Sequence, residues 1–536
     1  MIPIFFGEKG GQKFISTSGL AVARAVGSLP NEFGMRAFLL YASTFGDTLW
    51  QDVHQLPPAT VLKIGREGMY QSTYWSFQID ETFTRLSEQQ AVDCMIESFN
   101  RSIRRALEGE GTVWVSLTGG LDSRTLAALA HHSQIPFTTY CHGPMDSRDV
   151  RIAEQISHKM GWEYEYFGLP QDWGMQRATW FEQVIGQTDG LLDIIKMSRT
   201  IREQTLKAQK MAVSLWGYGG ELHRGVYWKH EFGRAGQTTR LDYEHLMDYR
   251  VIPAGSFLLR DVDRWKPLLR TEIKSRLRQV GEAQPDWLNT VKLDMIGTAL
   301  ERHACGGTVA AVLGQQRVIL PFDFKENITR IFSVNYRWRA HARMFRSILE
   351  QINPALAEIE TADGGPALPM RLSNSYRFIP YWLDSGEKLL WLLGNKITGR
   401  PLWQRRNVGP KGQAYPIGRW LQETVSLLEE AGILELEKMC SANMYQTKQL
   451  RSLLDFTQPY SKARDALISR VIAVEMALRL ANTGCQVPNE VEIDRLRETR
   501  RTRPPSRIAV SATLPPVSAA SGGISISSLY ASVSAS

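Results

Sequence analysis

A glycine-rich loop, Ser116-Leu-Thr-Gly-Gly-Leu-Asp-Ser-Arg124, connects an apolar β run, Val113 to Leu117, with an Ala/Leu-rich helical stretch, Leu126 to Ala130. Glycines allow backbone N–H groups to approach an anion closely, and the N-terminus of the following helix favours negative charge. The hydroxyls of Thr118 and Ser123 add further donors. The loop therefore predicts a phosphate-binding site at the carboxyl end of a strand.

An acidic residue inside this loop limits the kind of phosphate site. The loop lacks the Gly-Lys-[Ser/Thr] ending of the kinase-type P-loop, and it contains no lysine that could reach the phosphates. A nucleotide would repel the carboxylate of Asp122 unless a divalent cation lay between them, so we assign Asp122 to Mg²⁺. The alternative for this loop is a purely structural Gly-Gly turn before a helix.

Strands and helices alternate around the loop at a spacing typical of an α/β protein. The predicted strands are 112–117, 136–141, 163–167 and 211–216, and the predicted helices are 124–132 and 149–160. This alternation predicts a doubly wound parallel sheet. A second glycine-rich turn, Gly217-Tyr-Gly-Gly-Glu221, follows the fourth strand. Because ligands in such sheets bind at the carboxyl ends of strands, we expect the two turns to face one pocket.

The regions that flank this series have different patterns. Residues 1–80 contain short apolar runs, such as 37–41 and 60–64, between glycine and proline turns, and they predict a small β-rich domain. From about 241 to about 481 the pattern is mostly helical. After Arg507 the chain has no charged residue and is rich in Ser, Ala, Gly and Pro, which predicts a disordered tail.

Composition argues against several classes of protein. The chain has 536 residues and a formal charge of +8; six Arg against two acidic residues between 494 and 507 give +4, half of that total. A solvated tail junction explains this cluster better than a nucleic-acid patch does. No apolar run reaches about 18 residues and no signal peptide is visible, so we expect no membrane association and a cytoplasmic location. The five cysteines form no C-x-x-C pair, which argues against disulfides and a zinc site.

The loop at 116–124 resembles the Ser-Gly-Gly-Leu-Asp-Ser signature of the PP-loop ATP pyrophosphatases, and the later motifs resemble the asparagine synthetase B family in their order. Four further stretches carry this resemblance: Asp149 with Ala153, residues 216–227 (Trp-Gly-Tyr-Gly-Gly-Glu-Leu-His-Arg-Gly-Val-Tyr), residues 317–323 (Arg-Val-Ile-Leu-Pro-Phe-Asp), and residues 409–416 (Gly-Pro-Lys-Gly-Gln-Ala-Tyr-Pro) with Trp420.

The resemblance covers about residues 1–480 and implies a division of the chain. A truncated, β-rich glutaminase-like domain is expected at 1–80. An ATP-binding synthetase domain of the PP-loop, adenine nucleotide alpha hydrolase-like type, with a helical C-terminal part, is expected at 85–490. A basic junction and the tail follow at 495–536.

The resemblance also implies ATP and Mg²⁺ as cofactors and assigns residues to them. Asp122 and Glu221 correspond to the acidic residues that hold Mg²⁺ on pyrophosphate, and Lys411 corresponds to the lysine that stabilises charge during adenylation and amide formation. The implied ATP-binding residues are Ser116, Thr118, Gly119, Gly120, Leu121, Asp122, Ser123, His142, Gly217 and Gly219. The alternatives are a solvated loop carboxylate for Glu221 and an ordinary surface lysine for Lys411.

Two departures from the family pattern bear on the nucleophile. Asparagine synthetases have Glu where this chain has Tyr218, whereas the β-lactam and carbapenam synthetases have Tyr, assisted by a downstream Glu, as the general base. Here the downstream residues are Gln315 and Gln316, Glu301 is a distant substitute, and Tyr218 could instead simply pack. Glutamine-dependent members need Cys directly after the initiator Met, and position 2 is Ile, so we expect no glutaminase activity.

These features together imply an ATP-dependent, AMP-forming carbon–nitrogen ligase that works through an acyl-adenylate. We expect a natural-product or peptide cyclase of the lasso macrolactam type, acting on a small-molecule or peptide carboxylate, with a precursor peptide and a protease as partners. An asparagine synthetase that uses ammonia or a separate glutaminase is the second reading. A PP-loop tRNA-modifying enzyme, which would need an RNA-reading module or reactive cysteines, and a catalytically silent ATP-binding scaffold are further alternatives.

Overall fold

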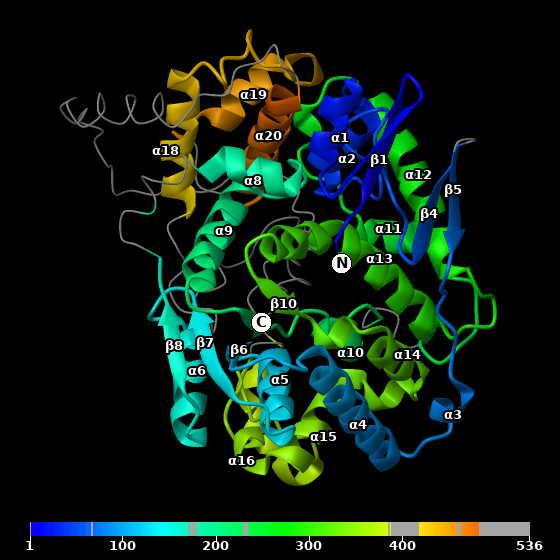
Figure 1. The fold of residues 1–536 in the computed structure, drawn as a ribbon, viewed down its shortest axis with the longest axis vertical. Helices are drawn as coiled ribbons and strands as arrows, with labels where there is room; N and C mark the ends of the chain where they lie inside the picture. The colour runs from blue at the N-terminus through cyan, green and yellow to red at the C-terminus, as the bar shows by residue number, and fades with distance from the viewer. Residues whose placement is uncertain are drawn as a thin grey trace, which may run out of the picture.

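The computed structural model describes residues 2–65, 68–169, 173, 180–228, 234–383, 386, 417–457 and 462–481. Its centre is a five-stranded parallel sheet with the strand order β10-β9-β6-β7-β8 (Figure 1). The strands are β6 (Val113–Ser116), β7 (Phe137–His142), β8 (Tyr164–Phe167), β9 (Val213–Leu215) and β10 (Arg317–Ile319). The first strand of this sheet, β6, lies in its middle; β7 and β8 extend it to one edge, and β9 and β10 then build the other edge. The predicted doubly wound parallel sheet is therefore confirmed.

Helices cover both faces of this sheet. On one face lies α6 (Arg148–Met160), where the hydroxyls of Ser157 and of Thr139 in β7 share a hydrogen bond of 2.8 Å. On the other face lies α9 (Ile194–Ala208), where the Lys207 ammonium is 4.9 Å from the ring centre of Tyr140. Neighbouring residues of a strand point to opposite faces, so Thr139 and Tyr140 mark the two layers.

The sequence does not predict β10 as a strand. Its three residues, Arg317–Ile319, lie in a region whose overall pattern is helical. Three residues are too few to show the alternation of apolar and polar side chains by which a strand is recognised. Their pairing with β9 is parallel and long-range in sequence, and it brings the segment that follows β10 to the carboxyl edge of the sheet.

The N-terminal region corrects one prediction. The apolar run at 37–41 is not a strand but the end of α2 (Glu32–Tyr41), in which every residue from Gly34 onward is buried. A helix that is buried on all sides gives a continuous apolar run, which periodicity alone cannot distinguish from a buried strand. The run at 60–64 does lie in a strand, β4 (Thr60–Gly65), which pairs with β5 (Gly68–Thr73).

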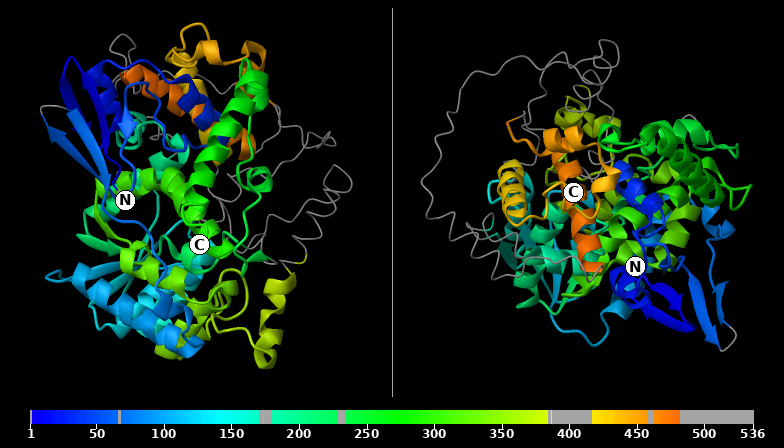
Figure 2. Two further views of the ribbon diagram at one scale, coloured as in Figure 1. Left: turned by 90° about the vertical axis from the view of Figure 1, so that its right-hand side faces the viewer. Right: turned by 90° about the horizontal axis from the view of Figure 1, so that it is seen from above.

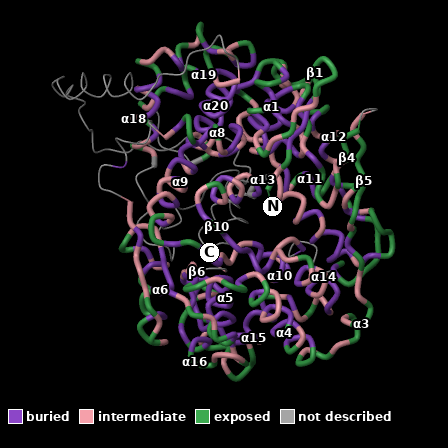
Figure 3. The backbone as a smooth tube through the Cα atoms, viewed as in Figure 1, coloured by how far each residue is buried: buried purple, intermediate pink, exposed green. Residues whose placement is uncertain are grey.

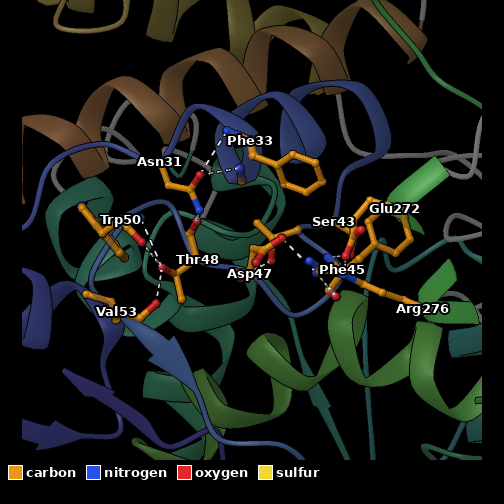
Figure 4. Close-up of polar contacts among 12 residues, drawn as sticks. Asn31, Phe33, Ser43, Phe45, Asp47, Thr48, Trp50, Val53, Glu272 and Arg276 are labelled. Atoms are coloured by element: carbon orange, nitrogen blue, oxygen red, sulfur yellow. Dashed lines mark hydrogen bonds and ion pairs between the residues drawn. The ribbon is translucent and has the colours of Figure 1, made fainter. Parts of the chain in front are cut away.

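A second sheet in this region has the order β2-β1-β3 and contains β1 (Phe5–Lys9), β2 (Gln12–Ser16) and β3 (His54–Gln55). Hydrogen bonds and an ion pair stabilise the turn after α2; Thr48 lies within the turn, and Arg276 comes from a distant part of the sequence (Figure 4). The Thr48 hydroxyl lies 2.8 Å from the Trp50 carbonyl oxygen. Arg276 donates to the Phe45 carbonyl oxygen at 2.9 Å and pairs with Asp47 at 2.9 Å.

The N-terminal region and the C-terminal helices share one hydrophobic core. Its members come from α1 (Gly19–Val26) and α2 as well as from α20 (Lys462–Ala481). Arg470 of α20 donates to the carbonyl oxygens of Phe38 and Leu39. In Figure 1 and in the left view of Figure 2, α1 and α20 lie at the end of the molecule opposite α5 (Leu121–His132) and α15 (Arg343–Ile352).

The remaining described α-helices are α3 (Glu81–Thr84), α4 (Glu88–Ala106), α8 (Phe181–Thr188), α10 (Gly220–His223), α11 (Tyr243–Arg250), α12 (Val262–Gly281), α13 (Asn289–Leu313), α14 (Lys325–Ser333), α16 (Pro354–Ala357), α18 (Ile417–Glu430) and α19 (Thr447–Leu454). The backbone of α5 is buried over most of its length (Figure 3). Among the described residues, no helix is long and apolar enough to cross a membrane.

Candidate functional site

The predicted ATP-binding residues lie along the carboxyl edge of the sheet. Ser116 is the last residue of β6, Thr118 to Gly120 form the turn, and Leu121 to Ser123 begin α5. His142 is the last residue of β7. Gly217 and Gly219 lie in the turn between β9 and α10. The structure thus brings residues from three neighbouring strand ends to one edge, which is where ligands bind in such sheets.

The first turn is held by its own hydroxyls and by the next helix. The hydroxyls of Thr118 and Ser123 are 2.9 Å apart, and the Thr118 N–H donates to the Ser123 hydroxyl at 3.0 Å. The Gly119 N–H donates to the Asp149 carboxylate at 3.0 Å, and the Gly120 N–H donates to the Thr118 hydroxyl at 3.2 Å. A phosphate group would exchange with these internal partners when it reached the turn.

The two glycine-rich turns touch each other. A Cβ atom added to Gly217 would lie 2.9 Å from the Ser123 nitrogen, and one added to Gly220 would overlap the Asp122 carboxyl group. Gly219 has φ +82°, and a Cβ there would overlap the carboxylate of Asp323. Only glycine permits this approach, so the second turn lies directly against the first.

Four carboxyl groups and one guanidinium meet at this contact. Asp122 and Glu221 are 3% and 5% exposed. Glu301, on α13, is buried and accepts a hydrogen bond from the Tyr227 hydroxyl. The Arg224 guanidinium lies 2.8 Å from Oδ2 of Asp122. The fourth carboxyl group belongs to Asp323, which ends the short 3₁₀ helix η4 (Pro321–Asp323) after β10.

Three carboxyl groups of this cluster, those of Asp122, Asp323 and Glu301, have raised pKa values. Burial raises the pKa of Asp122 to about 7, although Arg224 opposes the shift and Glu221 adds to it. Burial and the neighbouring Glu221 likewise raise the pKa of Asp323 to about 7. The pKa of Glu301 lies well above its ordinary value because of burial and then Glu221. The cluster has more acidic groups than the one guanidinium can neutralise, so it favours additional positive charge.

The cluster fits the Mg²⁺ that the family resemblance implies. Oδ1 of Asp122 and Oε1 of Glu221 are buried and have no hydrogen-bond partner. Such hard, anionic oxygens are the ligands that Mg²⁺ takes, usually together with water and substrate phosphates. No group of three or more His, Cys, Asp or Glu among the described residues is arranged to hold a metal. Asp122 and Glu221 would supply two ligands to Mg²⁺, and water and substrate phosphate oxygens would supply the others. The burial of Glu221 also excludes its reading as a solvated loop residue.

Tyr218 contacts apolar side chains. Its ring packs against an apolar cluster formed by α13 and β10, which contains Val309, Val312, Val318 and Leu320. Its hydroxyl is buried and has no hydrogen-bond partner. Glu301, the substitute partner named from the sequence, accepts its hydrogen bond from Tyr227 instead. The role of Tyr218 as a general base stays a prediction, and so does that of Lys411, which lies outside the described residues.

His142 belongs to a polar cluster that the sequence does not reveal. Its Nδ1 is 3.0 Å from the Lys207 ammonium, and its Nε2 is 3.8 Å from the Glu203 carboxylate. Burial lowers the pKa of Lys207 to about 8, and burial followed by the charge of Lys207 holds the pKa of His142 well below its ordinary value. Both effects favour the neutral imidazole of His142. Since an ammonium only donates, Nδ1 of His142 accepts and its proton lies on Nε2.

A segment after α16 supports the first turn from the side. Arg124, fully buried, donates to the carbonyl oxygens of Ile359 at 2.6 Å and Glu360 at 2.9 Å. The Ala362 N–H donates to the Gly119 carbonyl oxygen at 2.8 Å. The last residue of the Ser116 to Arg124 loop is thus an anchor rather than a ligand-facing group.

Sequence reasoning missed several members of the site. Arg224 and Asp323 lie inside stretches that carry the family resemblance, but nothing in a single sequence marks them as neighbours of Asp122. Glu203 and Lys207 are ordinary members of an amphipathic helix until the helix is placed on the sheet. The missing signal in each case is a contact between residues distant in sequence.

Comparison with known proteins agrees with this geometry. Residues 95–303 match the family model described as asparagine synthase. The matched region contains both glycine-rich turns, Arg224 and Glu301, whereas Asp323 lies beyond it. A search of curated proteins finds no match for the chain.

Proposed function

We infer from the asparagine synthase domain at residues 95–303 that this chain belongs to the asparagine synthase family and is an ATP-dependent ligase that forms amide bonds. We propose that it does so through an acyl-adenylate. The observation that supports this most directly is the contact between the two glycine-rich turns, which brings the Asp122 carboxyl group against Gly220, the residue before Glu221. Both carboxyl groups keep a buried oxygen without a hydrogen-bond partner. A carboxylate pair at a phosphate-binding turn is suited to the pyrophosphate end of ATP.

In the proposed first step a substrate carboxylate oxygen attacks the α-phosphorus of ATP, and the bond to pyrophosphate breaks. In the second step an amine attacks the acyl carbon, loses a proton and displaces AMP. Asp122 and Glu221 would hold the Mg²⁺, whose charge neutralises the pyrophosphate oxygens. Thr118 and Ser123 offer hydroxyl donors at the first turn, and Lys411 is the proposed stabiliser of charge on the adenylate.

We propose that the amine is carried by the substrate itself, as in a natural-product or lasso-type peptide cyclase with a precursor peptide and a protease as partners. Tyr218 in place of the Glu of asparagine synthetases supports this proposal.

Amidation of aspartate is the second candidate, because the matched family model is the one described as asparagine synthase. It differs from cyclisation in its nucleophile, which would be ammonia, free or supplied by a separate glutaminase. The two candidates therefore predict different dependence on added ammonium.

Exchange of labelled pyrophosphate into ATP tests the adenylation step and the substrate class together. The full chain is assayed with Mg²⁺ against linear peptides, other carboxylates and aspartate. Exchange with a peptide and a cyclic product would support the cyclase. Asparagine formation that needs aspartate and ammonium would favour the second candidate. If ATP still binds but no carboxylate supports exchange, the ligase proposal is overturned and a catalytically silent ATP-binding scaffold remains.

The Asp122→Asn variant makes this assay specific for the site. It removes one of the two carboxylates with little change in volume, and we expect exchange to fall by at least about 100-fold, the scale of losing one strong electrostatic contact in an active site. Asp52→Asn, on an exposed residue remote in sequence from the turns, is the matched control and should keep full exchange. Full exchange by Asp122→Asn would contradict the metal assignment.

A further inference from the structure

Arg224 places a guanidinium where the two glycine-rich turns meet. It follows the short helix α10 as its C-terminal cap, three residues after Glu221. Its side chain is 18% exposed, and that of its partner Asp122 is 4% exposed. A charge held this far from water is expensive unless it is well paired. The pairing of Arg224 is therefore informative about the charges that the site accommodates.

The ion pair with Asp122 leaves donors and acceptors unused on both sides. Arg224 approaches Oδ2 of Asp122 at 2.8 Å, while its Nε is buried without a hydrogen-bond partner. Oδ1 of Asp122 and Oε1 of Glu221 are also buried and unpartnered. A guanidinium has five N–H donors, so one ion pair does not exhaust it. The ion pair therefore leaves one buried donor of Arg224 and two buried carboxylate oxygens available to a ligand.

The chemistry of the unused groups points to one class of ligand. The free carboxylate oxygens suit a divalent cation, and the free Nε–H of the guanidinium suits a phosphate oxygen. The planar fork of arginine matches a phosphate group, which can accept two parallel hydrogen bonds from it. A metal-bound polyphosphate would meet both needs at once, whereas a cation alone would leave the guanidinium unsatisfied.

We propose that Arg224 is a further catalytic residue that contacts the pyrophosphate oxygens directly. The ion pair with Asp122 holds the guanidinium in place. With phosphate and Mg²⁺ bound, the free Oδ1 of Asp122 would serve the metal, and the free Nε–H of Arg224 would donate to a pyrophosphate oxygen. The proposal rests on the proposed function, because it places the pyrophosphate end of ATP at this contact, and it adds a positive charge borne by the chain to the charge of the metal.

Binding of inorganic pyrophosphate tests the proposal without the complete reaction. Calorimetry with the full chain and excess Mg²⁺ is carried out for the natural protein and for Arg224→Met, Arg224→Lys and Arg479→Met. We expect Arg224→Met to weaken pyrophosphate binding at least about tenfold and Arg224→Lys to weaken it less, since charged hydrogen bonds are worth roughly 1.5–3 kcal/mol. Arg479→Met removes a similarly buried ion pair, with Glu475 on α20, and should not change the affinity.

A second measurement separates direct contact from an effect on the metal. Binding of Mn²⁺ without pyrophosphate is followed by electron paramagnetic resonance in the same variants. We expect Arg224→Met to bind Mn²⁺ at least as tightly as the natural protein, because a nearby positive charge has been removed. Pyrophosphate affinity that is unchanged in Arg224→Met, or lost only in proportion to Mn²⁺ affinity, would overturn the proposal.

The outcome of these binding tests can be distinguished from the outcome of the exchange assay that tests the proposed function. Arg224-dependent pyrophosphate binding in a protein that shows no exchange with any carboxylate would support the contact and reject the ligase. Normal exchange, together with a pyrophosphate affinity that does not depend on Arg224, would support the ligase and reject the contact. If Arg224→Met does not fold, as judged by circular dichroism, the comparison of Arg224→Lys with Arg479→Met decides the question.

Discussion

Gly220 illustrates how a missing side chain shapes the site at the scale of single residues. A Cβ at this position would overlap the carboxyl group of Asp122, and one at Gly217 would press on the backbone of Ser123. The glycines of the second turn therefore serve close packing against the first turn as well as access for a phosphate. Sequence reasoning identified these glycines and Asp122 from the loop pattern. It could not identify Asp323, whose contact with Gly219 joins residues about a hundred positions apart.

Gly220→Ala should separate the two turns. The added methyl group has no space beside Asp122, and overpacking of this kind costs about 1–3 kcal/mol. We expect a lower free energy of unfolding in urea. We also expect pyrophosphate exchange to fall under conditions in which the variant is still folded. Gly111→Ala is the matched control, because a Cβ there meets nothing within 4 Å. Equal behaviour of the two variants would show that the turns do not need this contact.

At the scale of elements, α2 and β10 show where local patterns mislead. The run at 37–41 is helical because it lies inside the shared core, so no polar face marks its period. The position of Asn31 before α2 is a helix-start signal that was available in the sequence. Its side chain accepts from the N–H groups of Phe33 at 3.1 Å and Gly34 at 3.3 Å (Figure 4).

Substitution of Asn31 should measure how much this cap contributes. Asn31→Ala removes both acceptor contacts and the bond that Nδ2 donates to the Thr48 carbonyl oxygen, at 3.1 Å. We expect a loss of about 1–2 kcal/mol in the free energy of unfolding, from the urea midpoint. Asn31→Asp keeps the acceptor and should lose less. An unchanged midpoint in Asn31→Ala would show that packing alone holds α2.

At the scale of the whole molecule, the N-terminal region and the C-terminal helices form one packed unit. Asp189, at the end of α8, accepts from the Ser18 hydroxyl at 2.7 Å and from the Gly19 N–H at 2.9 Å, so it caps α1 from far away in sequence. The Ala254 N–H donates to the Leu40 carbonyl oxygen at 2.7 Å. The predicted domain boundary near residue 80 therefore separates two parts of the sequence whose side chains share one hydrophobic core.

Deletion of residues 2–80 should destabilise the rest of the chain. It would expose the faces of α8 and α20 that pack against α1 and α2, and apolar surface exposed in this way costs roughly 25 cal/mol per Å². We expect poor soluble yield and no cooperative thermal transition. Deletion of 508–536, which is predicted to be a tail, is the control and should leave the transition in place. A soluble 81–536 fragment with the natural melting temperature would contradict the shared core.

Glycine placement, the alternation of strands with helices and the acidic residue in the first turn are properties of adjacent residues. The α/β class, the parallel sheet and the place of Asp122 in a glycine-rich turn could therefore be predicted from the chain alone, and Glu221 was added by the family resemblance. The partners of those carboxylates could not. Arg224, Glu301 and Asp323 come together because β10 pairs with β9 and α13 packs beside them. Such contacts arise from the burial of apolar surface over long sequence distances, which leaves no local pattern to read.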